Sequence, residues 1–225
     1  ETRSCINILE PSGQSTEFLE PGQPVLPEEF LAFKAKLVQL TNEAEVVTFN
    51  GSVPKGISAE NYKELIEETM AAGVPCIVDA SGALLTSCID ALPTMIKPNT
   101  DEIGQLLGRE VTTEDEVIKA AQELHKRSIK IVVVSLGAKG ALMVSDEGTF
   151  RANPPKIEAI NPVGAGDTLV GSFAVALAQQ KPTSECLTFA LSCATASCLS
   201  AGTGRFDLDV ATKIQKQVTI KKIAE

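Results

Sequence analysis

The chain has 225 residues, 44% of them hydrophobic and 22% charged, which is typical of one globular domain with a sizeable core. Its formal net charge of -9 argues against a nucleic-acid surface, and no apolar run is long enough to span a bilayer. The six cysteines form no C-x-x-C pair, which disfavours zinc and thioredoxin-type sites and makes a reducing, cytoplasmic compartment the simplest interpretation.

The spacing of apolar residues predicts the elements in chain order. Two strands at 3–9 and 16–19 flank a turn at Pro11-Ser12-Gly13. Helices are expected at 28–41, 59–72, 84–92, 101–107 and 113–127, and strands at 46–49, 75–78, 94–96 and 131–136. A hairpin over 141–145 and 149–152 comes next, followed by two long helices after Asp167 and a last helix at 208–217.

Strands and helices alternate through the middle of the chain, which predicts an α/β fold with a mainly parallel sheet covered on both faces. Ligands of such sheets gather at the carboxyl ends of the strands. The loops that leave those ends are expected to converge there, and they are 50–56, 79–82, 97–102 and 135–140.

The segment 161–168, which reads Asn-Pro-Val-Gly-Ala-Gly-Asp-Thr, precedes an apolar, alanine-rich helix at 169–178. The backbone amides of Gly164, Ala165 and Gly166 are expected to be unpaired at the helix N-terminus. The helix dipole adds partial positive charge, and glycines let a phosphate approach the backbone. The segment does not match G-x-G-x-x-G, and no Walker A triplet occurs, so an anion-binding turn of another type is predicted.

Asp167 has two interpretations, because it is a carboxylate within an anion-binding turn. An acidic residue at this position can simply cap and stabilise the helix. It can also be the general base that takes a proton from a hydroxyl beside a bound phosphate.

The run Gly164-Ala165-Gly166-Asp167 resembles the second signature of the ribokinase-like (PfkB) sugar kinases. Other stretches agree with that resemblance along nearly the whole chain, namely 97–102 (Lys-Pro-Asn-Thr-Asp-Glu), 132–141, 51–56 and Thr2-Arg3. The resemblance implies a three-layer α/β/α sandwich with a mostly parallel sheet and a partial β-lid near the N-terminus. It also implies one kinase domain over 1–225, with a lid hairpin and return segment at 1–24.

The resemblance implies a role for each matching residue. Asp167 would be the catalytic base, and the amides of 164–166 would form the anion hole. ATP would be bound by Ser135, Gly137, Gly140, Lys97 and Asn99, with Thr195 and Gly202 near the adenine. Glu102 would orient water on Mg²⁺, which prefers oxygen ligands, and Arg3 would bind the phosphate of the sugar.

Structural alternatives remain for several of these residues. Asn99 and Glu102 could be a helix-capping pair, Lys97 a solvated lysine, and the 135–140 loop a tight hairpin turn. Lys55 and Asp79 are weaker candidates. The asparagine that is common in the family's adenine-binding helix has no counterpart here.

The implied activity is ATP-dependent phosphorylation of a ketohexose phosphate, tagatose 6-phosphate or fructose 1-phosphate, to a bisphosphate. One alternative is a non-catalytic nucleotide-binding remnant, because the family's sugar-contacting aspartate and glycine-rich first signature find no match here and the chain is incomplete at its N-terminus relative to the family. Another is a kinase for an unphosphorylated sugar or nucleoside, which Arg3 argues against. The expected partners are the sugar phosphate, ATP and a second copy through the lid, with no nucleic acid and no membrane.

Overall fold

The structure is a computed structural model, and it describes residues 2–10 and 14–224. The expected turn at Pro11-Ser12-Gly13 lies outside the described residues. The strands are β1 Cys5–Leu9, β2 Ser15–Leu19, β3 Val47–Asn50, β4 Cys76–Asp79, β5 Met95–Ile96, β6 Ile131–Ser135, β7 Ala141–Ser145, β8 Gly148–Asn153 and β9 Thr219–Ala224. The helices are α1 Pro27–Thr41, α2 Ala59–Ala71, α3 Gly82–Ile89, α4 Thr100–Leu107, α5 Glu114–Lys126, α6 Ala165–Ala178, α7 Thr183–Ser197 and α8 Leu208–Gln215.

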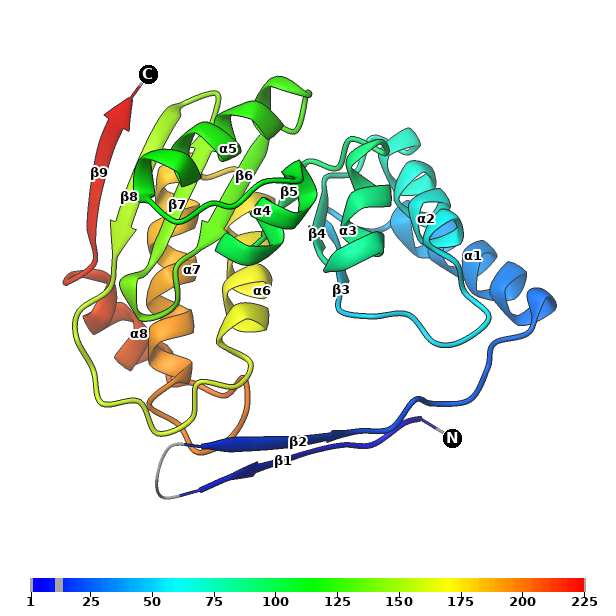
Figure 1. Cartoon of the computed structure of the whole chain (residues 1–225), viewed down its shortest axis with the longest axis horizontal. Helices are drawn as coiled ribbons and strands as arrows, with labels where there is room; N and C mark the ends of the chain where they lie inside the picture. Colours follow the sequence, from blue (N-terminus) through cyan, green and yellow to red (C-terminus); the bar gives the residue numbers. More distant parts are fainter. Residues whose placement is uncertain (1, 11–13, 225) are drawn as a thin grey trace.

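Seven strands form one sheet in the order β3-β4-β5-β6-β7-β8-β9 (Figure 1). The pairs from β3 to β6 are parallel, and β7 and β9 run against their neighbours. Strands β3 to β6 and β8 therefore share one direction, so their carboxyl ends lie at one edge of the sheet. That edge is the lower one in Figure 1, where the N-terminus of α6 also lies.

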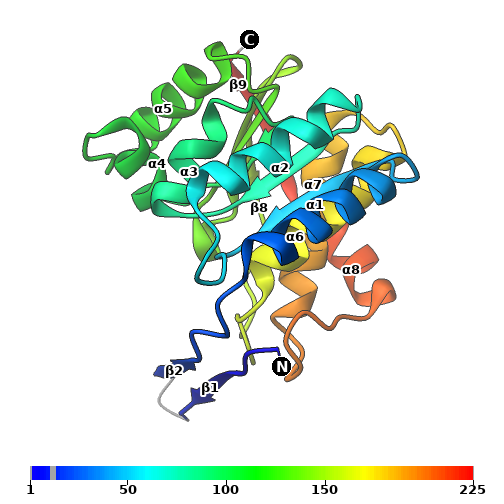
Figure 2. The same cartoon turned by 90° about the vertical axis from the view of Figure 1, so that its right-hand side faces the viewer.

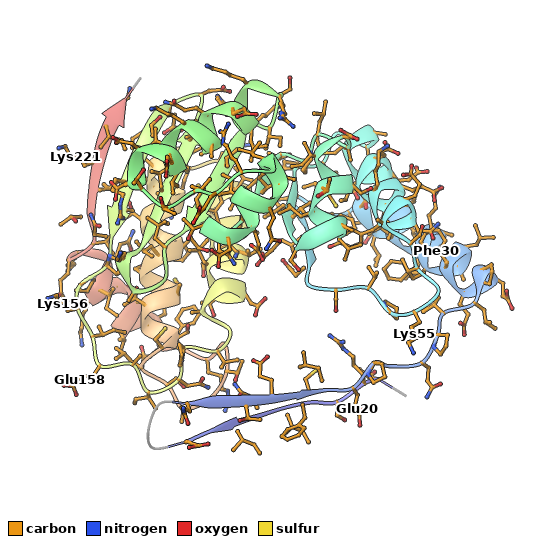
Figure 3. All side chains as sticks on the ribbon, in the orientation of Figure 1. Glu20, Phe30, Lys55, Lys156, Glu158 and Lys221 are labelled. Carbon is orange, nitrogen blue, oxygen red and sulfur yellow. The ribbon has the colours of Figure 1, made fainter. Side chains whose placement is uncertain are left out.

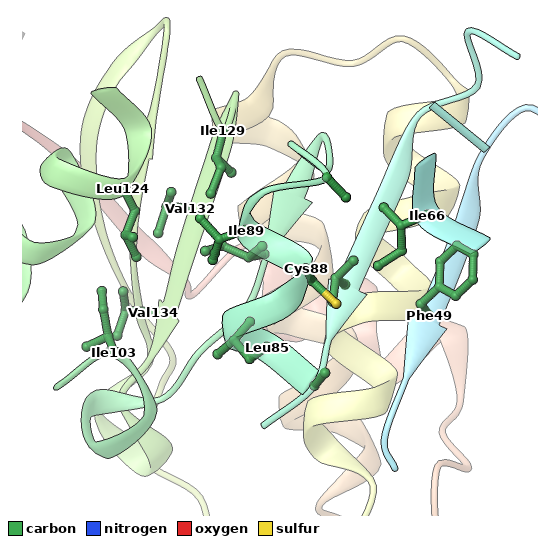
Figure 4. Close-up of a cluster of buried hydrophobic side chains, with 14 of the residues drawn as sticks. Phe49, Ile66, Leu85, Cys88, Ile89, Ile103, Leu124, Ile129, Val132 and Val134 are labelled. Atoms are coloured by element: carbon green, nitrogen blue, oxygen red, sulfur yellow. The ribbon is translucent and has the colours of Figure 1, made fainter. Parts of the chain in front are cut away.

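Helices cover both faces of the sheet, as the alternation of elements predicts. One core joins the sheet to α1–α5, and a second joins it to α6 and α7, against which α8 packs. Strand β6 shows why, because successive side chains of a strand point to opposite faces. Val132 and Val134 belong to the first core, where they lie among side chains of α3, α4 and α5 (Figure 4), and Ile131 and Val133 belong to the second.

The lid is a separate two-stranded antiparallel sheet formed by β1 and β2. It projects from the body on the side of the strand carboxyl ends (Figures 1 and 2). Ile6 pairs directly with Phe18, and Ile8 lies two residues along, so these three exposed side chains share one face. A two-stranded ribbon of this kind has little stability of its own, and its apolar face is left uncovered within the described chain.

The predicted α/β/α class with a mostly parallel sheet and a partial lid is confirmed. Strand β9 was not predicted, and the last helix ends at Gln215 instead of residue 217. The six-residue stretch of β9 carries two lysines, and its pairing with β8 depends on residues about 70 positions earlier in the chain. The division into one domain with a lid at 1–24 stays a prediction. None of the helices in the described part of the chain is long and apolar enough to cross a membrane.

Candidate active site

Three predicted loops meet at the carboxyl edge of the sheet. Asp79 ends β4, Lys97 directly follows β5, and Ser135 ends β6. The amide of Ser135 donates to the carbonyl of Pro98 at 3.0 Å, and Asn99 forms a parallel bridge with Ser135. The segment that begins α4 and the predicted nucleotide loop are therefore held side by side.

The turn at 162–167 provides free donors, although not all of those expected. Among the described residues, the amides of Gly164, Gly166 and Asp167 have no hydrogen-bond partner. The amide of Ala165, which was expected to be unpaired, donates to the carbonyl of Pro162 at 3.2 Å. Three amides are therefore still free at the start of α6. They are those of Gly164, Gly166 and Asp167, instead of those of Gly164, Ala165 and Gly166.

Asn161 holds this turn in place, and sequence reasoning missed it. Its side chain is buried, and its amide group donates to the carbonyl of Ala201 at 3.1 Å and to the hydroxyl of Thr203 at 3.4 Å. Its side-chain oxygen accepts from the amide of Val163 at 3.0 Å. Gly164 packs on the same loop, because a Cβ there would lie 2.8 Å from Cγ2 of Thr203, and its φ of 80° also favours glycine.

Asp167 lies in the first turn of α6 and is exposed. No side-chain hydrogen bond or ion pair of Asp167 occurs within the described residues. Within the described chain, the carboxylate is therefore free to contact a ligand.

Lys97 and Asp79 form an ion pair of 3.1 Å, with side chains 8% and 19% exposed. Burial raises the pKa of the Asp79 carboxyl above its usual value, and the Lys97 ammonium opposes that rise. The carboxylates of Asp167 and Glu102 act on the same carboxyl and raise its pKa further. Lys97, Asp167 and Glu102 therefore all lie within electrostatic reach of Asp79.

Asn99 and Glu102 form a capping box at the start of α4. The side chain of Asn99 accepts from the amide of Glu102, and Oε2 of Glu102 accepts from the amide of Asn99, both at 2.8 Å. The structural alternative for this pair is thus realised, and Oε1 of Glu102 is left for another partner. No group of three His, Cys, Asp or Glu residues in the described chain could hold a metal alone. A single carboxylate oxygen such as Oε1 of Glu102 fits a magnesium ion that takes most of its ligands from water and phosphate.

The predicted nucleotide loop is a single turn of 3-10 helix at Gly137–Lys139. Gly140 has a structural reason to be glycine, because a Cβ there would lie 2.2 Å from the carbonyl oxygen of Ala152. Gly137 has a φ of 58°, and a Cβ there would meet open space. Gly137 lies in the exposed part of this loop, together with Ala138 and Lys139, whereas Gly140 is buried.

Two other predicted residues have less to offer a nucleotide. The hydroxyl of Thr195 is buried and donates to the carbonyl of Leu191 at 2.7 Å within α7. Gly202 lies in the loop after α7, where its amide donates to the hydroxyl of Ser200. Their assignment to the adenine site stays a prediction.

Arg3 lies at the base of the lid. Its guanidinium donates to the hydroxyl of Ser52 at 3.3 Å and to the carbonyl of Glu20 at 3.4 Å. The return segment is tied to the same loop, because the amide of Val25 donates to the carbonyl of Lys55 at 2.7 Å; Figure 3 labels Glu20 on the lid side and Lys55 on the loop. A cavity of about 740 Å³ adjoins Arg3 and does not reach the 162–167 turn.

Comparison with known proteins gives a consistent result. The family described as "pfkB family carbohydrate kinase" matches residues 1–210. The chain is 34% identical over 226 aligned positions to the tagatose-6-phosphate kinase of Staphylococcus epidermidis, covering 99% of this chain and 73% of that protein.

Two solved structures resemble the fold closely. Phosphofructokinase-2 of Escherichia coli in complex with substrates and products has a TM-score of 0.86 and 33% identity, covering 95% of this chain and 70% of that one. A protein of Thermotoga maritima described as a possible 1-phosphofructokinase has a TM-score of 0.87 over 99% of this chain and 71% of that one. The latter is 24% identical and supports the fold alone.

Proposed function

Because the chain belongs to the pfkB family of carbohydrate kinases, we propose that it transfers the γ-phosphoryl group of ATP to a hydroxyl of a ketohexose phosphate, tagatose 6-phosphate or fructose 1-phosphate, forming a bisphosphate. The observation that carries the proposal is the exposed carboxylate of Asp167 directly after free backbone amides at the start of α6.

The reaction asks little more of the protein than positioning and charge stabilisation. Asp167 accepts the proton of the attacking sugar hydroxyl. The amides of Gly164, Gly166 and Asp167 donate to the transferred phosphoryl group, on which charge accumulates in the transition state. The ammonium of Lys97 adds positive charge at the same place, and Arg3 at the lid base binds the phosphate that the sugar already carries.

Magnesium, when bound with ATP, would offset part of the phosphate charge. Glu102 would take part through Oε1, because Oε2 is used in the capping box. Asn99 keeps its side-chain NH₂ group for a phosphate, because its oxygen is used in that box. Ser135, Gly137 and Gly140 shape the loop over which the nucleotide lies, and Thr195 and Gly202 lie toward its adenine.

The test is the variant Asp167→Asn, which keeps the shape of the side chain and removes the base. We expect turnover to fall by roughly 10²–10⁴, measured as ADP released with tagatose 6-phosphate, fructose 1-phosphate or free fructose as acceptor. Asp209→Asn is the matched control, because Asp209 is an acid in the first turn of α8, and its activity should not change. Near-normal turnover in Asp167→Asn would contradict the assignment of the base.

A second candidate function is nucleotide binding without turnover. It is favoured by the cavity beside Arg3, which does not reach the 162–167 turn where the transfer would take place. Calorimetry together with the ADP-release assay separates the two candidate functions. A non-catalytic protein binds MgATP in calorimetry and releases no ADP with any sugar. Turnover with free fructose instead of the sugar phosphates would favour a kinase for unphosphorylated sugars.

Two further observations support proposals about the compartment of the protein and its association. The six cysteines are all free, which suits a reducing compartment such as the cytoplasm. The apolar face of the lid, formed by Ile6, Ile8 and Phe18, is exposed. We assign this face to a homodimer in which the lids of two copies cover each other.

A further inference from the structure

The buried ammonium of Lys97 has one protein partner. Its ion pair with Asp79 is the only one, and no other hydrogen bond of its Nζ occurs within the described chain. A lysine ammonium carries three donors, so one carboxylate leaves it with capacity for a further acceptor. A charge this deeply buried is costly unless its remaining donors find partners, which indicates an acceptor that arrives with a ligand.

Gly166 shows where that acceptor would lie. A Cβ at Gly166 would be 3.6 Å from Nζ of Lys97, so the ammonium faces the first turn of α6. The backbone of Gly166 is not in the left-handed region, and no backbone atom blocks a side chain there. The missing side chain instead leaves open space in front of the ammonium, beside the free amide of Gly166.

Asp79 lies within electrostatic reach of Asp167 and Glu102, and the ammonium that it holds faces Gly166, the neighbour of Asp167 in the chain. If Lys97 turned to Asp167, an ion pair would occupy the general base and remove the positive charge from the phosphoryl site. In the structure the ammonium instead pairs with Asp79, the last residue of β4, with 3.1 Å between Nζ of Lys97 and Oδ1 of Asp79. The backbone of Lys97 is tied to β4 as well, because its amide donates to the carbonyl of Val78 at 3.1 Å.

We propose that Asp79 is a positioning residue, which holds the Lys97 ammonium against the transferred phosphoryl group and keeps it away from Asp167. The inference depends on the proposed kinase function. It predicts that Asp79 acts on the γ-phosphate of ATP through Lys97 and makes no contact of its own with the nucleotide. Removing the Asp79 carboxylate should therefore weaken the binding of ATP more than the binding of ADP, because ADP lacks that phosphate.

The experiment is a double-mutant cycle on the full chain, with MgATP and MgADP affinities measured by calorimetry. We expect Asp79→Asn to lower the ratio of ATP to ADP affinity by about tenfold, with ADP affinity nearly unchanged. Lys97→Met should lower the ratio at least as much, and adding Asp79→Asn to Lys97→Met should have no further effect, because coupled residues are non-additive. Asp79→Glu, which keeps the carboxylate, should restore part of the ratio.

The control is Glu64→Gln, which removes a carboxylate paired with Lys34 at 2.6 Å on the outer helices and should leave the ratio unchanged. If Asp79→Asn does not fold because Lys97 is left unpaired, the comparison of Lys97→Met with the double variant decides. A further loss in the double variant, or an unchanged ratio in Asp79→Asn, overturns the inference and leaves the kinase proposal intact. A wild-type chain that binds neither nucleotide refutes the kinase proposal itself.

Discussion

Two glutamates occupy the same local structure and are expected to behave differently. Glu102 and Glu116 are each the third residue of a helix and accept the amide of the N-cap residue. Of the two, Glu102 is the one that lies within electrostatic reach of Asp79. We expect Glu102→Gln to lower turnover and raise the Mg²⁺ concentration needed for half-maximal rate, because the charge near the metal is lost.

Glu116→Gln is the matched control for this prediction. Glutamine still serves in a capping box, so both variants should keep their helices. Turnover rates measured over a range of Mg²⁺ concentrations distinguish the roles of the two glutamates. Equal effects of both substitutions would mean that Glu102 only caps α4.

Glu116 also leads to a pH prediction. Hydrogen bonds from the amides of Thr112 and Thr113 and from their hydroxyls lower its pKa from the usual 4.5 to about 2. A carboxyl with a lower pKa in the folded state contributes stability above pH 4.5, and this contribution disappears as the pH falls toward 2. The melting temperature of wild type should exceed that of Glu116→Gln at pH 7, and the difference should shrink between pH 4.5 and 2.

The two glycines of α6 differ in what surrounds them. Gly166 faces Lys97, whereas a Cβ at Gly171 would meet open space. Gly166→Val should therefore abolish tight ATP binding by filling the space in front of the free amides, with the fold retained. Gly171→Ala should keep ATP binding and stabilise the helix by about 0.5–1 kcal/mol.

Calorimetric titration with MgATP and thermal unfolding of both variants test this view of α6. If Gly166→Val binds ATP as wild type does, the start of α6 is not the anion site. If Gly171→Ala also loses ATP binding, the loss reflects distortion of the helix and says nothing about the turn.

The lid is the part of the molecule on which the proposed dimer depends. Its face carries Phe18 at 57% and Ile6 at 58% exposure, on a ribbon whose two strands pair only with each other within the described chain. We expect a dimer by size-exclusion chromatography with light scattering, and Phe18→Asp should give a monomer because a charge would be buried between the lids. Leu208→Asp, at a residue 60% exposed on α8, should leave the dimer intact. A wild-type monomer would disprove the lid interface.

Local pattern was sufficient for much of the fold. The continuous β-branched run of β6 identified a strand buried on both faces, and caps such as Thr113 marked where helices begin. Strand β9 escaped prediction because a short stretch with lysines becomes a strand only when β8 offers its edge. The same reason hid Asn161, whose burial follows from contacts with a loop about 40 residues later.

By itself, the sequence determined the class of fold, the turn that precedes α6 and the identity of the groups that carry charge, because these depend on residue types at short spacing. The tertiary structure decided which amides at the start of α6 stay free and that Asp79 pairs with Lys97. Those outcomes depend on the ends of separate strands meeting at one edge of the sheet. Spacing along the chain does not specify distances between groups that come together only when the sheet forms.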